Sequence, residues 1–146
     1  MPLSRAFLKK TNIHLLLFFL IVGIDQFTKW GARETGIVQL NTGVSLGLFN
    51  DFSVLLHIFI FLLTIIVLLF TFKNSWQKHA YYYVAILAAG FSNVIDRVIW
   101  GGVQDFLPVP FFQVQNNIAD WVIFIAFLGI FVSNMQPEVK KESSES

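Results

Sequence analysis

Two acidic side chains with no basic neighbour are the residues of this sequence best suited to chemistry. Asp105 has no lysine or arginine within seven residues, and Asp120 follows it 15 positions later. A connection of this length can fold back and bring the two carboxyl groups together. Two carboxylates in contact cannot both ionise, so they share one proton. Such a pair can activate a water molecule as a base and protonate a leaving amine as an acid, as in an aspartic protease.

The charged pairs elsewhere have a structural interpretation beside a functional one. Asp25 and Lys29 are four residues apart, acid before base, which is the order that forms an ion pair along one helix. This pair either only neutralises itself or also helps to build a site. Asn93, Asp96 and Arg97 lie on one face of a helix and are predicted to form an interhelical polar clamp that orients the loop after Trp100. The neighbouring arginine is expected to keep the Asp96 carboxyl group ionised.

Two asparagines begin short polar segments. The loop from Asn41 to Ser45, which contains Gly43, is typical of a turn, and the Asn41 amide is equally suited to hold a substrate backbone. Asn117 is predicted to cap a helix, with Asp120 at the third helical position, where the helix dipole favours negative charge. The cap alone would explain an aspartate at that position.

The composition indicates that these residues belong to a membrane protein. Of the 146 residues, 55% are hydrophobic and 13% are charged, whereas soluble domains average about 25% charged residues. The absence of cysteine excludes disulfides, thiolate metal sites and cysteine nucleophiles from this chain. The three histidines lie in separate segments, so no zinc site is expected. A net charge of +1 gives no basic field for a nucleic acid.

Four apolar stretches approach the about 20 residues that span a bilayer. They cover residues 13–30, 52–72, 80–100 and 118–135, and each is predicted to be a helix because backbone groups in lipid must pair internally. Seven lysines and arginines lie on one side of these stretches and three on the other, which predicts that both termini are cytoplasmic. No clear cleavage site follows the first stretch, so we expect an uncleaved anchor. Residues 1–136 then form one four-helix domain, and residues 137–146 a polar cytoplasmic tail.

The predicted topology gathers the carboxylates at the outer face. All five aspartates, at positions 25, 51, 96, 105 and 120, lie in or beside outer helix ends and outer loops. Ionisable groups at such depths usually face a bundle interior or a wet cavity. Residues 37–40 are predicted to form a short strand, and residues 103–114 an extended or irregular segment. No carboxylate reaches the inner half, which disfavours an ion pathway. A non-enzymatic membrane scaffold or transport subunit, whose polar residues only pack helices, is the alternative to an enzyme.

Five motifs in this order resemble those of the lipoprotein signal peptidases, or signal peptidase II. They are D-Q-x-x-K at 25–29, N-T-G-V-S at 41–45, N-x-x-D-R at 93–97, V-x-D-F at 103–106 and N-I-A-D at 117–120. The resemblance runs from about residue 13 to residue 133. It implies an all-α membrane protein with four transmembrane helices and a small extracytoplasmic β-cradle formed by the outer loops.

The resemblance also implies an activity. The family consists of aspartic endopeptidases of the bacterial inner membrane, which cleave prolipoprotein signal peptides just before a diacylglyceryl-modified cysteine. It implies a monomer with its site at the outer face, membrane lipids and modified prolipoproteins as partners, and neither cofactor, metal nor nucleic acid. The matching motifs make Asp105 and Asp120 the catalytic residues. The residues that would bind substrate or support the site are Asp25, Lys29, Asn41, Gly43, Asn93, Asp96, Arg97 and Asn117.

Overall fold

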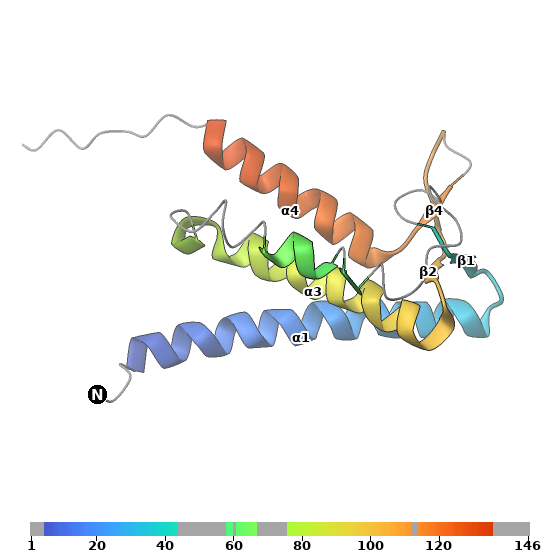
Figure 1. Ribbon diagram of the computed structural model, residues 1–146, viewed down its shortest axis with the longest axis horizontal. Coiled ribbons are helices and arrows are strands. Elements are labelled where there is room, and N and C mark those ends of the chain that lie inside the picture. Colours follow the sequence, from blue (N-terminus) through green and yellow to red (C-terminus); the bar gives the residue numbers. More distant parts are fainter. Residues whose placement is uncertain (1–4, 44–57, 60, 67–75, 112–113, 136–146) are drawn as a thin grey trace, which may run out of the picture.

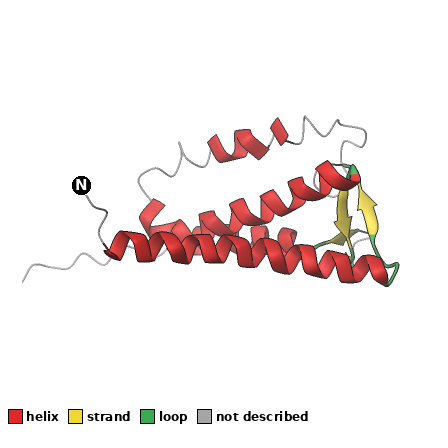
Figure 2. Ribbon diagram, turned by 90° about the horizontal axis from the view of Figure 1, so that it is seen from below, coloured by secondary structure: helices red, strands yellow, loops and turns green. Residues whose placement is uncertain are grey.

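In the described part of the chain, three long helices run along the molecule, with small β-sheets at one end (Figures 1 and 2). The computed structural model describes residues 5–43, 58–59, 61–66, 76–111 and 114–135. The helices are α1 (Arg5–Glu34), α3 (Trp76–Trp100) and α4 (Ile118–Met135). Helix α3 packs against both α1 and α4, which contact each other much less. The middle helix therefore carries residues that can reach both neighbours.

All three helices are long and apolar enough to cross a membrane. The candidate spans are Thr11–Glu34, Lys78–Trp100 and Ile118–Met135. Large apolar side chains such as Phe19 and Phe131 are 67% and 61% exposed, so they face outward, where lipid would cover them. Three of the four predicted spans are thus confirmed as helices of suitable length. Helix α4 has the predicted bounds of 118–135, while α1 extends beyond the predicted 13–30 at both ends.

The remaining predictions about segments fall largely on residues outside the described part of the chain. Of the predicted helix at 52–72, the structure describes 58–59 and 61–66, all of which are helical. The predicted tail at 137–146 and the end of the domain at 136 lie outside the described residues.

Small residues allow α3 and α4 to pack closely. A methyl group on Gly129 of α4 would lie 2.5 Å from the Tyr82 ring of α3, so the ring in this position packs directly on the glycine. Next to this contact, a buried cluster joins the two helices, and its members are Tyr83, Ile86, Ala126 and Ile130. Close packing through small residues is a common way for membrane helices to associate.

The strands form two short antiparallel sheets beside the ends of the helices. Strand β1 (Gln39–Asn41) pairs with β2 (Val103–Asp105), and β3 (Leu107–Pro108) pairs with β4 (Gln115–Asn116). The predicted strand at 37–40 is confirmed as β1, which begins two residues later and ends one residue later than predicted. The predicted extended segment at 103–114 contains β2 and β3.

Two glycines set the turn from α3 into β2. Gly101 has a φ of +76°, a conformation that ends the helix and that side chains disfavour. A Cβ atom on Gly102 would lie 2.9 Å from the backbone oxygen of Asn41. The two glycines therefore let β2 begin at once and lie directly against β1.

Candidate active site

Asp105 ends strand β2 and is buried, with 2% of its surface exposed. Asn41, on the paired strand β1, donates an amide hydrogen to Asp105 Oδ2 at 3.0 Å. The Asn41 Oδ1 atom accepts the Gly43 backbone N–H at 3.0 Å, which turns the amide nitrogen toward the aspartate. Asn117 donates to the other oxygen, Asp105 Oδ1, at 2.7 Å. Each carboxyl oxygen therefore has an amide donor.

Asp120 lies in the first turn of α4. Its backbone N–H donates to Asn117 Oδ1 at 3.0 Å, which confirms the predicted helix cap. Because the Asn117 amide nitrogen bonds to Asp105, one side chain links the two acidic residues. Asn93 of α3 donates to Asp120 Oδ1 at 2.9 Å. The acidic pair is thus held by amides from three different parts of the chain.

The two carboxyl groups line one cavity of about 420 Å³. Apolar side chains form much of its wall, so the acids meet a space that is only partly polar. The residues that line it are Asn41, Asn93, Arg97, Val103, Asp105, Asn116, Asp120, Ile123, Phe124 and Phe127. A cavity of this size, with a few convergent polar groups, has the usual character of a small-molecule or peptide site.

Burial raises the pKa of the Asp105 carboxyl from its usual 3.8 to about 6. The hydrogen bonds from Asn41 and Asn117 oppose this rise in pKa, because they stabilise the ionised form, while the nearby charge of Asp120 adds to it. Asp105 therefore changes its protonation state close to neutral pH. The folded state gains stability from the protonated form below about pH 4 and loses this contribution as the pH rises through about 6.

The Asn41 hydrogen bond gives a first testable prediction. In Asn41→Ala, the ionised Asp105 loses a donor, so its pKa should rise by about one unit, since a hydrogen bond to a charged group contributes roughly 1.5–3 kcal/mol and one unit is about 1.4 kcal/mol. The limb of the pH–activity profile near pH 6 should therefore move to higher pH. The matched control is Gln39→Ala, an exposed position on the same strand, whose profile should stay in place. An unchanged limb in Asn41→Ala would contradict this account of the Asp105 pKa.

Lys29 lies at the centre of a second, fully buried group of charges. Its Nζ atom is 2.6 Å from Asp25 Oδ2 and 2.8 Å from Asp96 Oδ2, and all three side chains have 0% exposure. The predicted ion pair between Asp25 and Lys29 is therefore confirmed. Lys29 also donates to Asn93 Oδ1 at 2.8 Å, so its three N–H donors all have acceptors.

This arrangement orients the Asn93 side chain. Because the Asn93 oxygen accepts from Lys29, its amide nitrogen is the atom left to donate to Asp120. The buried ammonium group thus acts on the acidic pair through one intervening side chain. Asn93 of α3 therefore links Lys29 of α1 to Asp120 in the first turn of α4.

Asp25 fastens α4 to α1 directly. Its Oδ1 atom accepts the Ala119 backbone N–H at 2.8 Å, one of the donors that a helix N-terminus leaves unpaired. The Asp25 Oδ2 atom also accepts the Ser92 hydroxyl at 2.7 Å. A carboxylate from one helix therefore satisfies the start of another, and this contact fixes the residue next to Asp120.

The predicted interhelical clamp is confirmed, because Asp96 of α3 pairs with Lys29 of α1, but the prediction that Arg97 is the cation beside the Asp96 carboxyl is wrong. The Asp96 carboxyl pairs with Lys29, while the Arg97 guanidinium donates to the backbone oxygens of Asn93 and Gly43, each at 3.3 Å. Adjacent residues of a helix point in different directions, so Asp96 turns toward α1 and Arg97 toward the cavity. The negative charges of Asp120, Asp105 and Asp96 all attract the guanidinium group.

Three polar residues that the sequence reasoning did not assign to the site complete the buried group. Gln26 donates to Ser92 Oγ at 3.0 Å and to Asp96 Oδ1 at 2.9 Å. Gln104 donates its backbone N–H to Asp96 Oδ2 at 3.1 Å and accepts from Arg33 at 3.0 Å. Gln26 is part of the D-Q-x-x-K motif, and this could have indicated that it belongs to the site. The partners of Ser92 and Gln104 lie on other elements, so no spacing along the sequence indicates them.

The structure brings all ten predicted site residues into one connected region. Within the described residues, no group of three or more histidine, aspartate or glutamate side chains could hold a metal ion. The connected residues are Asp25, Lys29, Asn41, Gly43, Asn93, Asp96, Arg97, Asp105, Asn117 and Asp120.

Apolar helices around buried, hydrogen-bonded carboxylates define a helical membrane protein with an acidic site. Residues 17–136 match the family model of signal peptidase (SPase) II, and the chain belongs to this family of proteases. The family predicted from the five motifs is thereby confirmed. Membership of a protease family also argues against the non-enzymatic alternative.

Relatives and solved structures agree with this assignment. The chain is 37% identical over 140 residues to a lipoprotein signal peptidase of Wigglesworthia glossinidia brevipalpis, with 82% of this chain and 90% of that one covered. It is 31% identical over 146 residues to one of Thermodesulfovibrio yellowstonii, covering 88% and 97%. A bacterial membrane enzyme solved by the in meso method at 2.3 Å has a TM-score of 0.75, with 92% and 94% coverage. Its identity of 21% supports the fold alone.

Proposed function

We propose that this chain is an intramembrane aspartic endopeptidase in which Asp105 and Asp120 form the catalytic pair. It removes signal peptides from diacylglyceryl-modified prolipoproteins and cleaves just before the lipidated cysteine. The observation that supports this most strongly is that both carboxyl groups line one cavity while amide donors hold them from behind. The family and the names of the relatives support the class of substrate.

The proposed mechanism needs one proton shared by the two carboxyl groups. The ionised carboxyl takes a proton from water as the water oxygen attacks the scissile carbonyl carbon. The protonated carboxyl gives its proton to the leaving amine as the carbon–nitrogen bond breaks. Because the two groups interact, the pair titrates as a unit, with the raised pKa of Asp105 as one contribution.

Arg97 is suited to a supporting electrostatic role. It lines the same cavity as the acidic pair, and two backbone oxygens hold its guanidinium group. A fixed positive charge beside a carbonyl under attack stabilises the negative oxygen that develops there. Its bonds to Asn93 of α3 and to Gly43 beyond β1 also hold the cavity wall together.

The proposed topology places the site at the outer face of the bacterial inner membrane. Helices α1 and α3 end, and α4 begins, beside the strands (Figure 1). This arrangement supports four transmembrane helices, a cradle of strands on the outer side and two cytoplasmic termini. We propose one domain over 1–136, a cytoplasmic tail over 137–146 and a monomer that meets its substrates among membrane lipids.

Dependence on the lipid group tests the proposed substrate. Diacylated and unmodified precursors of identical sequence, presented in the same micelles, should differ in kcat/KM by about 100-fold. Burial of only three or four methylenes, at roughly 0.8 kcal/mol each, is enough for this ratio. Changes in the mature protein beyond the cysteine should have far smaller effects. Equal rates for the two precursors would show that the peptide alone is recognised and would overturn the lipid-dependent part of the proposal.

A further inference from the structure

Strand β2 lies beside the ends of α1 and α3 (Figure 1), and its residue Gln104 is bonded to both helices. Gln104 is 2% exposed. Its backbone N–H and its side-chain amide donate to Asp96 of α3 at 3.1 and 3.4 Å. Its Oε1 atom accepts from the Arg33 guanidinium of α1 at 3.0 Å. Because side chains alternate along a strand, Gln104 faces these helices while the next residue, Asp105, faces the cavity.

Arg33 contacts both sides of the turn that leads from α3 into β2. Its guanidinium carbon lies 4.5 Å from the centre of the Trp100 ring, a cation–π contact, and its Nη1 atom donates to Gln104. Trp100 ends α3, and Gly101 and Gly102 follow it. Glycines restrict the backbone of this turn very little, so contacts from other elements determine where β2 lies. The pairing with β1 is one of them, and Arg33 supplies two more from α1.

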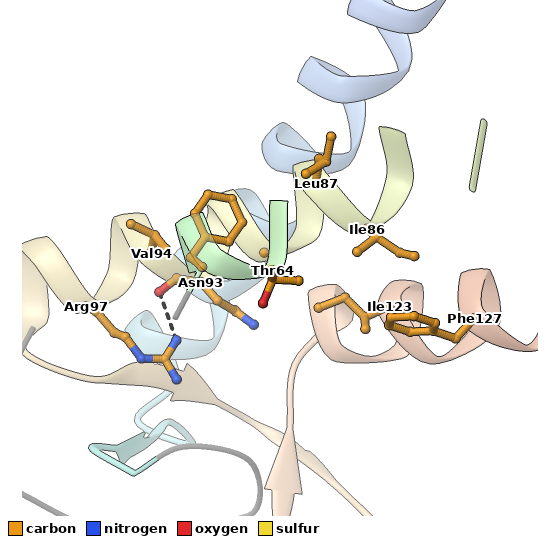
Figure 3. Close-up of a pocket in the computed structure, with 10 residues that line it drawn as sticks. Thr64, Ile86, Leu87, Asn93, Val94, Arg97, Ile123 and Phe127 are labelled. Carbon is orange, nitrogen blue, oxygen red and sulfur yellow. Dashed lines mark hydrogen bonds between the residues drawn. The ribbon is translucent and has the colours of Figure 1, made fainter. Parts of the chain in front are cut away.

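Arg97, the other arginine at this end of the molecule, has a different position. It lines the cavity, where its guanidinium donates to the backbone oxygen of Asn93 at 3.3 Å (Figure 3). Arg33 is not among the described residues that line this cavity. A change at Arg33 therefore leaves the cavity wall intact and reaches Asp105 only through the strand.

We propose that Arg33 is a positioning residue for Asp105 that acts through Gln104. This inference rests on the proposed function and adds two residues that determine the geometry of its acidic pair. The hydrogen bonds of Gln104 hold β2 from one face, so that Asp105 on the other face meets its two amide donors at 3.0 and 2.7 Å. A displacement of about 1 Å caused by a remote change can lower a rate by about 10²-fold.

The charge of Arg33 is not what this role depends on. Several groups act on the Asp105 carboxyl through hydrogen bonds or through their charges. Among the described residues they are the donors Asn41 and Asn117 and the charged residues Asp120, Lys29 and Arg97. Arg33 is not one of them. A changed pKa of Asp105 in an Arg33 variant therefore reports altered distances to the amide donors.

Arg33→Met and Gln104→Met test this role, because each removes the contact and keeps an unbranched side chain. In both, kcat for a diacylated precursor should fall about tenfold while KM stays nearly constant, since neither residue lines the cavity. The limb of the pH–activity profile near pH 6 should move up by about half a unit, because weaker hydrogen bonds stabilise the ionised Asp105 less. The double variant should be no worse than either single one, because both changes remove the same contact.

The protonation of Asp105 can also be followed without a substrate. The infrared C=O band of its protonated carboxyl group, assigned by its loss in Asp105→Asn, should titrate with a midpoint that moves in the same direction. If Arg33→Met fails to fold, Arg33→Lys keeps the charge and a donor but loses the planar group that stacks on Trp100. It should give a smaller shift of the same sign.

Thr35→Val is the matched control. It removes a hydroxyl group that donates to the Ala32 backbone oxygen at 2.9 Å, so it disturbs the same end of α1 by the loss of one hydrogen bond. Because this bond is made to α1 and not to β2, the variant should keep the kcat, the pH limb and the infrared midpoint of the unaltered enzyme.

The outcomes separate this inference from the proposed function. An unchanged kcat and an unchanged Asp105 midpoint in a folded Arg33→Met or Gln104→Met variant would overturn the positioning role. A lower Tm with unchanged kcat per folded enzyme would assign the contact to stability alone, and a higher KM with unchanged kcat would assign it to binding. Either result would overturn it as well. No cleavage of any diacylated precursor by the unaltered enzyme would instead refute the proposed function, and the infrared midpoints would still test the positioning role.

Discussion

Asp105→Asn and Asp120→Asn are each expected to lower kcat/KM for a diacylated precursor by about 10³-fold or more. General acid–base catalysis contributes typically 10²–10⁴-fold, and each carboxyl group of the pair carries out one of the two proton transfers that cleavage needs. Asparagine keeps the size of the side chain, and the amide donors around both positions come from residues that stay unchanged. The measurement is cleavage in micelles, with helical content checked by circular dichroism.

The double variant makes this test sharper. Residues that act as one unit are strongly non-additive, so Asp105→Asn with Asp120→Asn should be little worse than either single change. Glu34→Gln is the control, because Glu34 is an exposed carboxylate at the strand-facing end of α1, outside the cavity. It should keep nearly full activity. Near-normal turnover in either single variant would rule out the catalytic pair.

Local features of the site could be predicted because their causes are local. The ion pair between Asp25 and Lys29 follows from spacing along one helix, and the cap at Asn117 from the donors of a helix start. The bounds of α4 follow from an apolar stretch that begins at this cap. The five motifs predicted which residues belong to the site.

The partners across helices could not be predicted in the same way. Asp96 pairs with Lys29 rather than with Arg97, because the face of α3 that carries Asp96 lies against α1. The sequence gives no rotation of one helix against another. The antiparallel pairing of β1 with β2 is also non-local, and it is this pairing that brings Asn41 to Asp105. Non-local packing therefore decides which polar groups meet.

Lys29→Met should be the most destabilising of the changes considered. It leaves Asp25 and Asp96, both with 0% exposure, without the cation between them. Removal of one partner from a buried ion pair typically costs about 3–5 kcal/mol. Thermal unfolding in detergent should show a large fall in Tm. Lys78→Met is the control, because Lys78 is exposed and, among the described residues, donates to the Ser133 backbone oxygen, so the Tm of this variant should barely change.

Neutralising both carboxylates separates the effect of charge from the effect of position. The triple variant Asp25→Asn, Lys29→Met and Asp96→Asn removes all three buried charges at nearly constant shape, so much of the lost stability should return. Cleavage should stay low, because Asn93 Oδ1 still lacks the ammonium donor that turns its amide toward Asp120. A triple variant no more stable than Lys29→Met would show that uncompensated charge is not the cause of the instability. Full recovery of activity would show that Lys29 does not position Asn93.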